Sequence, residues 1–289
     1  MRKSRSKPIR RASIKRTLPL FGSLASTASV SASSPFPTTS CLASAVSIRQ
    51  GTGKKAVLAA YDAGFRNLSI DLMYGLPGQS LEDVDCDLQI LDELPVVHAS
   101  IYSLIVEDGT QLKAGLEKGD WQLPPDEATE AMARTVHDAM HRYGFHHYEI
   151  SSYAKGPFES RHNSKYWTYE PYLGFGVSAH SFDGTMRWAN VANIPAYIRQ
   201  AGKGSIVAES VTIDARRAVE DYCFLALRRR VGIDYGDYAR RFGKSIEADF
   251  GPVINQLVCQ GLLERTAKGC CLSEEGLGYG NYVFSKFIR

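Results

Sequence analysis

The sequence lacks a long apolar run, cysteines at the spacing of a metal site and, over its first 61 residues, acidic side chains. No stretch of the 289 residues reaches the roughly 18–20 uninterrupted apolar residues of a membrane-spanning helix, so no integral membrane segment is expected. The 6 cysteines are not spaced as in zinc fingers or ferredoxins, and no secretory signal accompanies them, so we expect reduced, buried thiols. Asp and Glu are absent from Met1 to Tyr61, although this stretch holds 11 of the 34 Lys and Arg side chains.

The charge of the chain is therefore unevenly distributed. The formal net charge of +3 hides an acidic body, because the residues after Tyr61 hold 23 basic against 31 acidic side chains. Proteins that bind nucleic-acid backbones present a basic face, so we expect no nucleic-acid partner. A hydrophobic content of 44% and a charged content of 22% are ordinary for a soluble globular protein.

From Lys55 onward the chain alternates between helical and strand patterns. Helices are expected up to Gly64, from Ser80 to Leu94 and from Asp126 to Tyr143, and strands at 67–75, 98–104, 145–150 and 172–182. Ser80 and Asp83 form a capping box, which marks the start of a helix. Strands that alternate with helices of this length predict parallel β/α units.

The composition changes near residues 201–204, which we interpret as a linker. After Asp214 the apolar residues recur at helical spacing. A short hairpin follows, from Leu263 to Leu272, and a last helix is expected from Ser273. Helices followed by a small hairpin indicate a winged-helix-like module at the end of the chain.

Asp71 is the most informative single residue. It lies inside the apolar strand Asn67–Tyr74, which is followed by the turn Gly75-Leu76-Pro77-Gly78. A carboxylate is costly to bury in a strand unless a partner hydrogen-bonds to it. Asp71 is therefore either a cap of the turn at Gly75 or an acceptor for the amine or hydroxyl of a ligand.

The richest polar cluster contains His162, in the run Ser160-Arg161-His162-Asn163-Ser164-Lys165-Tyr166-Trp167. A histidine beside an aromatic pair can supply an axial imidazole to heme iron while the rings pack on the porphyrin. The alternative is a histidine that hydrogen-bonds the backbone and orders a loop. His180 is a weaker second candidate, in a glycine-rich segment whose small residues allow close approach of a backbone or ligand.

These segments resemble a family of radical-SAM proteins, the group of oxygen-independent coproporphyrinogen III oxidase and the heme chaperone HemW. The resemblance is carried by Asp71–Gly78, by the strand His98–Leu104 and by the pattern His-Asn-x-x-Tyr-Trp at 162–167, and it runs from about Lys55 to the C-terminus. It implies an α/β fold: residues 55–204 as the C-terminal half of a partial TIM-type (β/α)6 barrel, and residues 205–289 as a small helical, winged-helix-like domain. The run Glu107–Thr110 is closer to the chaperone than to the oxidase.

The resemblance also implies ligands and a function. The family uses a 4Fe–4S cluster, S-adenosyl-L-methionine and heme. It places Asp71, Tyr102 and Ile105 near S-adenosylmethionine and His162 at the heme. The implied function is heme binding and insertion, and the alternative is coproporphyrinogen III oxidation in porphyrin biosynthesis. The expected partners are heme and, as clients, a bacterioferritin or respiratory heme proteins, in the cytoplasm.

The cluster-binding part of the family pattern is missing from this sequence. The family needs a Cys-x3-Cys-x2-Cys loop before the fifth strand, and Cys41 is the only cysteine that precedes Asn67. We therefore expect no cluster in this chain and no enzymatic activity. Residues 1–54 are interpreted as a disordered, non-family segment from a shifted reading frame or misassigned start. The alternative is a mitochondrial or plastid transit peptide, which is likewise Arg- and Ser-rich and acid-free. A fifth strand that lacks its fourth neighbour is expected to have an unpaired edge.

Overall fold

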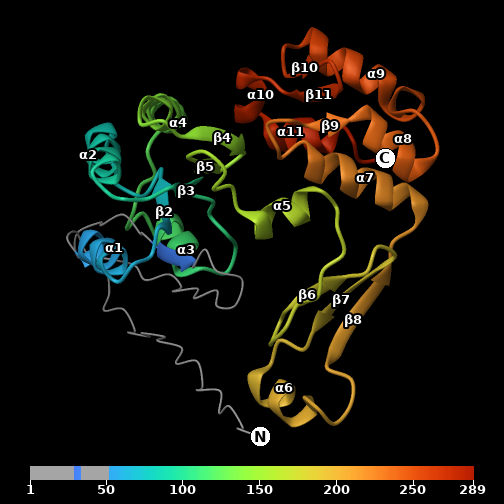
Figure 1. The fold of residues 1–289 in the computed structure, drawn as a ribbon, viewed down its shortest axis with the longest axis horizontal. Coiled ribbons are helices and arrows are strands. Elements are labelled where there is room, and N and C mark those ends of the chain that lie inside the picture. The colour runs from blue at the N-terminus through green and yellow to red at the C-terminus, as the bar shows by residue number, and fades with distance from the viewer. Residues whose placement is uncertain (1–28, 34–51) are drawn as a thin grey trace, which may run out of the picture. The chain divides into compact units, whose positions relative to one another are not determined.

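The structure is a computed structural model that describes residues 29–33 and 52–289 (Figure 1). The chain forms two compact units. The first consists of the described residues up to His147 together with Ser151–Glu159, and the second of Tyr148–Ile150 together with Ser160–Arg289. The segment at 201–204, which the sequence suggested as a linker, joins a helix to a strand inside the second unit.

The first unit is built on a mixed sheet. Its five strands follow the order β1-β2-β3-β5-β4. They are β1 (Ser29–Ser33), β2 (Asn67–Tyr74), β3 (His98–Ser103), β4 (His146–Glu149) and β5 (Ser152–Ala154). The pair β2–β3 is parallel, whereas β1 is antiparallel to β2 and β5 is antiparallel to β3.

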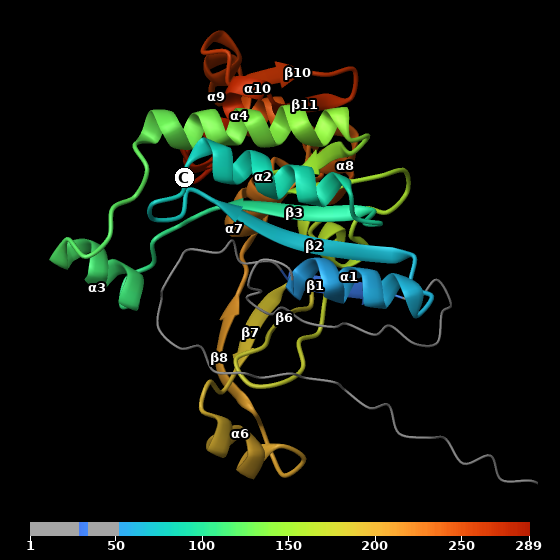
Figure 2. The same ribbon diagram turned by 90° about the vertical axis from the view of Figure 1, so that its left-hand side faces the viewer.

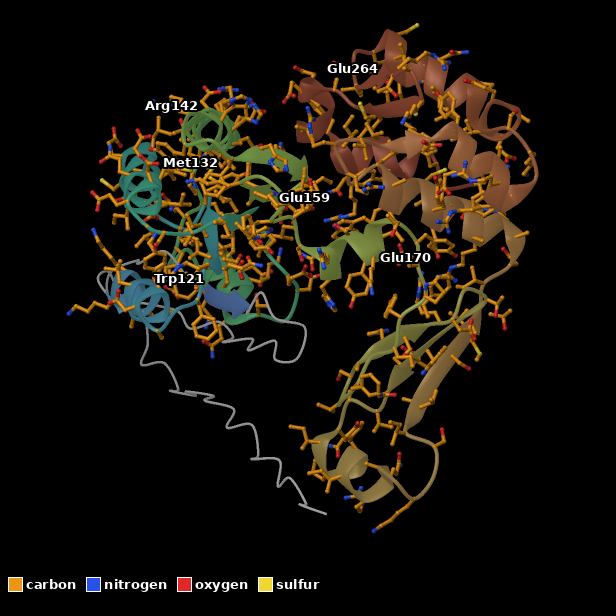
Figure 3. The ribbon with its side chains drawn as sticks, viewed as in Figure 1. Trp121, Met132, Arg142, Glu159, Glu170 and Glu264 are labelled. Atoms are coloured by element: carbon orange, nitrogen blue, oxygen red, sulfur yellow. The ribbon has the colours of Figure 1, made fainter. Side chains whose placement is uncertain are left out.

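Two helices cover one face of this sheet. The helices of the unit are α1 (Thr52–Asp62), α2 (Leu81–Asp92), α3 (Gln111–Lys118) and α4 (Asp126–Arg142). Figure 2 shows α2 and α4 lying side by side over β2 and β3. The capping box predicted at Ser80 is present, and it fixes the start of α2. Met132 of α4 points into the core between helices and sheet, where it is 1% exposed (Figure 3).

The prediction that β2 has an unpaired edge is wrong. Strand β1 pairs with it over five positions, from Ser29 opposite Asp71 to Ser33 opposite Asn67. Backbone donors and acceptors at a sheet edge gain from a hydrogen-bonded neighbour, and this segment supplies one. The disorder expected for residues 1–54 is likewise wrong for 29–33 and for the start of α1 at Thr52, while the rest of that segment lies outside the described residues.

The second unit contains two three-stranded sheets. One has the order β6-β7-β8 and the other the order β10-β11-β9. The strands are β6 (His180–Phe182), β7 (Met186–Asn190), β8 (Val207–Thr212), β9 (Ile233–Asp234), β10 (Leu263–Arg265) and β11 (Gly269–Leu272). The helices are α5 (Arg161–Trp167), α6 (Ile194–Gln200), α7 (Ala215–Ala226), α8 (Tyr235–Phe242), α9 (Ile246–Cys259), α10 (Glu274–Gly278) and α11 (Gly280–Ser285).

The end of the chain has the elements that its sequence predicted. Helix α7 begins after the N-cap Asp214, the hairpin pairs Leu263 with Leu272, and α10 begins after the N-cap Ser273. The core of this module includes Cys223 and Cys270, both fully buried, as expected for the thiols. The same expectation is wrong for Cys86 and Cys259, which are exposed.

The predicted α/β fold is confirmed, but parallel pairing is limited. Among the described strands, β2 and β3 form a parallel pair joined through α2, β1 and β5 pair antiparallel with them, and the sheet does not close a barrel. Strands β4 and β5 are joined by two residues, which is too short for the crossover that parallel pairing requires. The prediction of one strand over residues 172–182 is wrong. Gly176 and Ser178 have φ angles of 110° and 58°, so the chain turns and only residues 180–182 form a strand.

In the described ranges, no helix has the length and apolarity needed to span a membrane.

Candidate functional site

The sheet of the first unit has one apolar and one polar face. Leu68, Ile70 and Leu72 of β2 are buried in the core with α2 and α4. Successive side chains of a strand point to opposite faces, so Ser69 and Asp71 face the other side. The parallel register sets Ser69 beside His98 and Asp71 beside Ser100.

Two of the residues predicted near S-adenosylmethionine share this polar face. Tyr102 follows Ser100 by two positions on β3, so it lies on the same face as Asp71, one pleat further along the strand. Its side chain is 40% exposed. Ile105 lies beyond the end of β3 and is 71% exposed. The structure thus brings Asp71 and Tyr102 together on one face and leaves Ile105 in the loop that follows.

Sequence reasoning missed His98, which is buried near Asp71. Its Nδ1 atom lies 2.7 Å from the Ser69 hydroxyl. Burial lowers the pKa of His98, and the negative charge of Asp71 opposes this shift only in part. The imidazole is therefore neutral at neutral pH. Two more hydroxyls, those of Ser152 and Ser100, lie 3.4 Å apart on the same buried face. This row of hydroxyls, imidazole and carboxylate can hydrogen-bond the amines and hydroxyls of a polar ligand.

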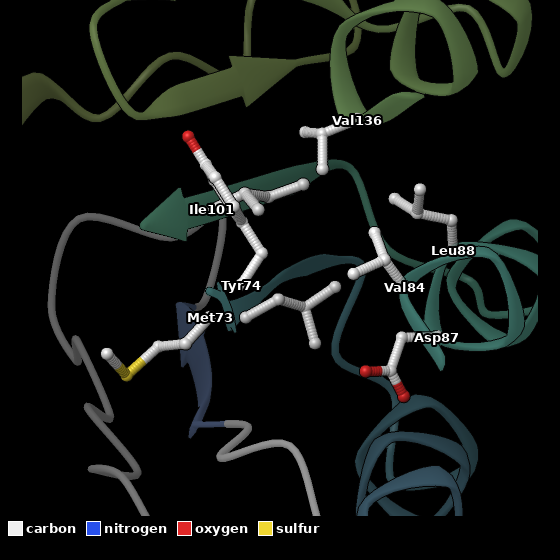
Figure 4. Close-up of a pocket in the computed structure, with 8 residues that line it drawn as sticks. Met73, Tyr74, Val84, Asp87, Leu88, Ile101 and Val136 are labelled. Carbon is white, nitrogen blue, oxygen red and sulfur yellow. The ribbon is translucent and has the colours of Figure 1, made fainter. Parts of the chain in front are cut away.

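The cleft shown in Figure 4 does not belong to this polar face. It is lined mainly by core side chains of β2, β3, α2 and α4, namely Leu72, Val84, Leu88, Ile101 and Val136, with Asp87 as the charged residue. It has space for roughly one water molecule. None of the predicted site residues lines it, so we assign it no ligand.

The described residues do not fit the family's iron–sulfur cluster. Such a cluster is held by cysteine thiolates that converge on one point. Within residues 29–33 and 52–289, no three His, Cys, Asp or Glu side chains lie close enough to hold a metal ion. Cys41 lies outside the described residues.

The second candidate site lies on α5. Ser160 caps this helix by accepting a hydrogen bond from the Asn163 amide. His162 and Tyr166 are one helical turn apart and therefore neighbours on the helix surface. The His162 Nε2 atom lies 3.0 Å from the Tyr166 hydroxyl, and the two rings meet edge to face with centroids 5.0 Å apart. The side chain of His162 is exposed.

Protein groups surround the aromatic residues of α5. The Tyr166 ring meets Tyr172 edge to face at 4.6 Å. The guanidinium of Arg228 lies over the Trp167 ring at 4.5 Å, a cation–π contact. The Trp167 indole nitrogen is buried and has no hydrogen-bond partner in the described part of the chain.

The glycine-rich segment allows a close backbone approach, as predicted. A Cβ atom on Gly174 would lie 2.1 Å from the carbonyl oxygen of His180, so only glycine fits. His180 itself is exposed at the start of β6. Two other adjacent histidines contact different groups: His146 lies 3.0 Å from Glu159, and His147 stacks on Tyr153 at 4.4 Å.

Known proteins match most of the chain. A family model described as the HemN C-terminal domain matches residues 213–278. The heme chaperone HemW of Bacillus subtilis is 36% identical over 230 residues, 79% of this chain and 61% of the relative. Its counterpart in Lactococcus lactis subsp. lactis is 33% identical, covering 78% of this chain and 59% of the relative. A Danio rerio protein named radical S-adenosyl methionine domain-containing protein 1, mitochondrial, is 33% identical over 180 residues, 58% of this chain and 40% of the relative.

One solved structure shares the fold. The coproporphyrinogen III oxidase HemN of Escherichia coli, described as a radical SAM enzyme, superposes with a TM-score of 0.66 at 17% identity. The match covers 81% of this chain and 57% of that structure. The chain spans about three fifths of the length of the HemW proteins of Bacillus subtilis and Lactococcus lactis. The family model, the relatives and the shared fold agree, and the chain belongs to the radical-SAM group that contains HemW and HemN.

Proposed function

We propose that the chain binds heme and takes part in its insertion, as a heme chaperone of the HemW type. The observation that carries this proposal is the exposed His162 imidazole on α5, in a chain whose relatives at 36% and 33% identity are named heme chaperones. The oxidase alternative has less support. Its relative at 17% identity shares the fold alone.

His162 is the proposed axial ligand of heme iron. An exposed imidazole at a helix surface can reach an iron atom without displacing the protein core. Arg161 and Lys165 are exposed on the same short helix, and their cationic groups suit the two propionates of heme. The proposed clients are a bacterioferritin or respiratory heme proteins.

Asp71, Tyr102 and Ile105 are the proposed contacts for S-adenosyl-L-methionine, which the family uses as a cofactor. Asp71 would accept hydrogen bonds from a ligand amine or hydroxyl, and Tyr102 offers a half-exposed ring for an adenine. The neutral imidazole of His98 adds a polar group beside them. We also propose the family division into residues 55–204 and 205–289. We further propose a cytoplasmic location; the alternative is a mitochondrial or plastid one, and the Danio rerio relative is named mitochondrial.

Titration with hemin tests the proposed function. The purified full chain should shift the Soret band of hemin to that of an imidazole-ligated complex. His162→Ala should remove this spectrum and weaken binding by at least 10-fold. His141→Ala is the control, since His141 is an exposed histidine of α4 that is not a candidate for the heme site and should leave the spectrum unchanged. Equal spectra and affinities for wild type and His162→Ala would contradict the proposal.

A further inference from the structure

The nitrogen of His162 that a heme iron would bind is already engaged. Its Nε2 atom and the Tyr166 hydroxyl lie 3.0 Å apart, within hydrogen-bond distance. The contact excludes ligation in either tautomer. If the tyrosine hydroxyl donates, the Nε2 lone pair is occupied as the acceptor of that hydrogen bond. If Nε2–H donates to the tyrosine oxygen, the lone pair lies on Nδ1 instead.

The other nitrogen cannot substitute for Nε2. Nδ1 adjoins the ring carbon that carries Cβ, so a porphyrin plane approaching it would collide with the side chain's own Cβ and with the helix backbone. Nε2 is at the far end of the ring and is the atom that a flat macrocycle can reach. Iron ligation by His162 therefore requires that the contact with Tyr166 opens.

Packing holds Tyr166 in place. Its ring contacts the His162 ring edge to face on one side and the Tyr172 ring at 4.6 Å and 83° on the other. Tyr172 is fixed in turn, because its backbone exchanges two hydrogen bonds with Phe182, whose side chain is 2% exposed. The hydroxyl is thus directed at Nε2 by a row of packed rings rather than by a freely rotating side chain.

We propose that Tyr166 regulates heme binding by occupying the ligating nitrogen of His162. This inference rests on the proposed function. In the closed state the hydroxyl covers Nε2, and the chain does not ligate iron. In the open state Tyr166 moves aside and the imidazole binds heme. The hydroxyl of Tyr166 would thus compete with heme iron for Nε2 and lower the heme affinity of the chain.

Removal of one hydroxyl tests this proposal. Tyr166→Phe keeps the ring and its edge-to-face contacts but cannot hydrogen-bond Nε2. It should bind hemin about 2- to 10-fold more tightly than wild type, the range that corresponds to one net hydrogen bond, with the same imidazole-ligated spectrum. Tyr172→Phe is the matched control, because it removes a hydroxyl from the next ring of the row and should leave the affinity unchanged. In the absence of heme, long-range 1H–15N NMR spectra should show the His162 ring nitrogens shifted in Tyr166→Phe and unshifted in Tyr172→Phe.

The outcomes separate this inference from the proposed function. Equal heme affinities for Tyr166→Phe and wild type, with His162→Ala still deficient, would overturn the role of Tyr166 and leave the heme site intact. Weaker binding by Tyr166→Phe, or a changed ligand spectrum, would overturn it too, because the tyrosine would then support ligation. A wild-type chain that binds no heme, or binds it equally well without His162, would refute both.

Discussion

Asp249 of α9 is held by two cationic side chains and a tyrosine. Its side chain is 7% exposed and forms ion pairs with Lys244 at 2.9 Å and with Arg289 at 3.0 Å. Tyr238 donates a further hydrogen bond to it. Burial alone would raise the pKa of Asp249, but the hydrogen bonds and positive charges prevail and lower it to about 2.

This network makes the stability of the second unit depend on pH. Because the folded pKa lies below the ordinary value of 3.8, the carboxylate contributes stability above about pH 4 and loses it as the pH falls toward 2. We expect Asp249→Asn to lower the free energy of unfolding at pH 7 by about 2 kcal/mol and to weaken its pH dependence between 4 and 2. Urea unfolding at pH 7 and pH 3 measures both. Glu264→Gln, at an exposed position of β10, should change neither.

Asp71 shows what single residues reveal of a site. Its place inside an apolar strand before a Gly-Leu-Pro-Gly turn was enough to single it out as either a cap of the turn or an acceptor for a ligand. The role of His98 could not be predicted in this way, because its nearness to Asp71 depends on the register between two strands separated by helix α2. A single sequence carries no signal for that register. The contact between His162 and Tyr166 depends only on helical spacing. The separation of four residues between them was therefore a signal from which this contact could have been predicted.

Among the elements, those with local signals were predicted best. The capping box at Ser80, the N-cap at Asp214 and the hairpin from Leu263 to Leu272 are each determined by neighbours in sequence. The segment at 172–182 was mistaken for a strand because its apolar residues alternate, whereas its glycines and the positive φ of Ser178 turn the chain. Strand β1 was missed because serine-rich composition carries no strand pattern, and its pairing is decided by the open edge of β2.

The pairing of β1 with β2 leads to a prediction at the level of elements. Deletion of residues 29–33 should expose the backbone of β2 beside Asp71, and exposed strand edges promote association between chains. We expect the variant without residues 29–33 to form oligomers of higher mass than the parent chain at equal concentration, as measured by light scattering after size-exclusion chromatography. Deletion of five residues from 5–9 is the length-matched control. Identical elution of the parent and both deletion variants would show that β1 does not protect this edge.

At the scale of the whole molecule, the chain passes between its two compact units more than once. Tyr148–Ile150 belongs to the second unit, although the residues on both sides belong to the first. Backbone hydrogen bonds fix this segment: the Arg230 amide donates to the Tyr148 carbonyl, and the Ile150 amide donates to the Arg228 carbonyl. The sequence predicted one boundary near residue 204 because composition changes there. Composition does not record which segments pack together, so the interleaving could not be predicted.

Interleaved segments should couple the unfolding of the two units. Neither unit can unfold fully without releasing the chain that enters and leaves it at residues 148–160, so we expect one cooperative transition. Hydrogen exchange measured by mass spectrometry at increasing urea reports on each unit separately. Amides of α4 in the first unit and of α9 in the second should lose protection at the same urea concentration, and Asp249→Asn should lower that concentration for both. Loss of protection in α9 alone, with α4 unaffected by the substitution, would show that the units unfold independently.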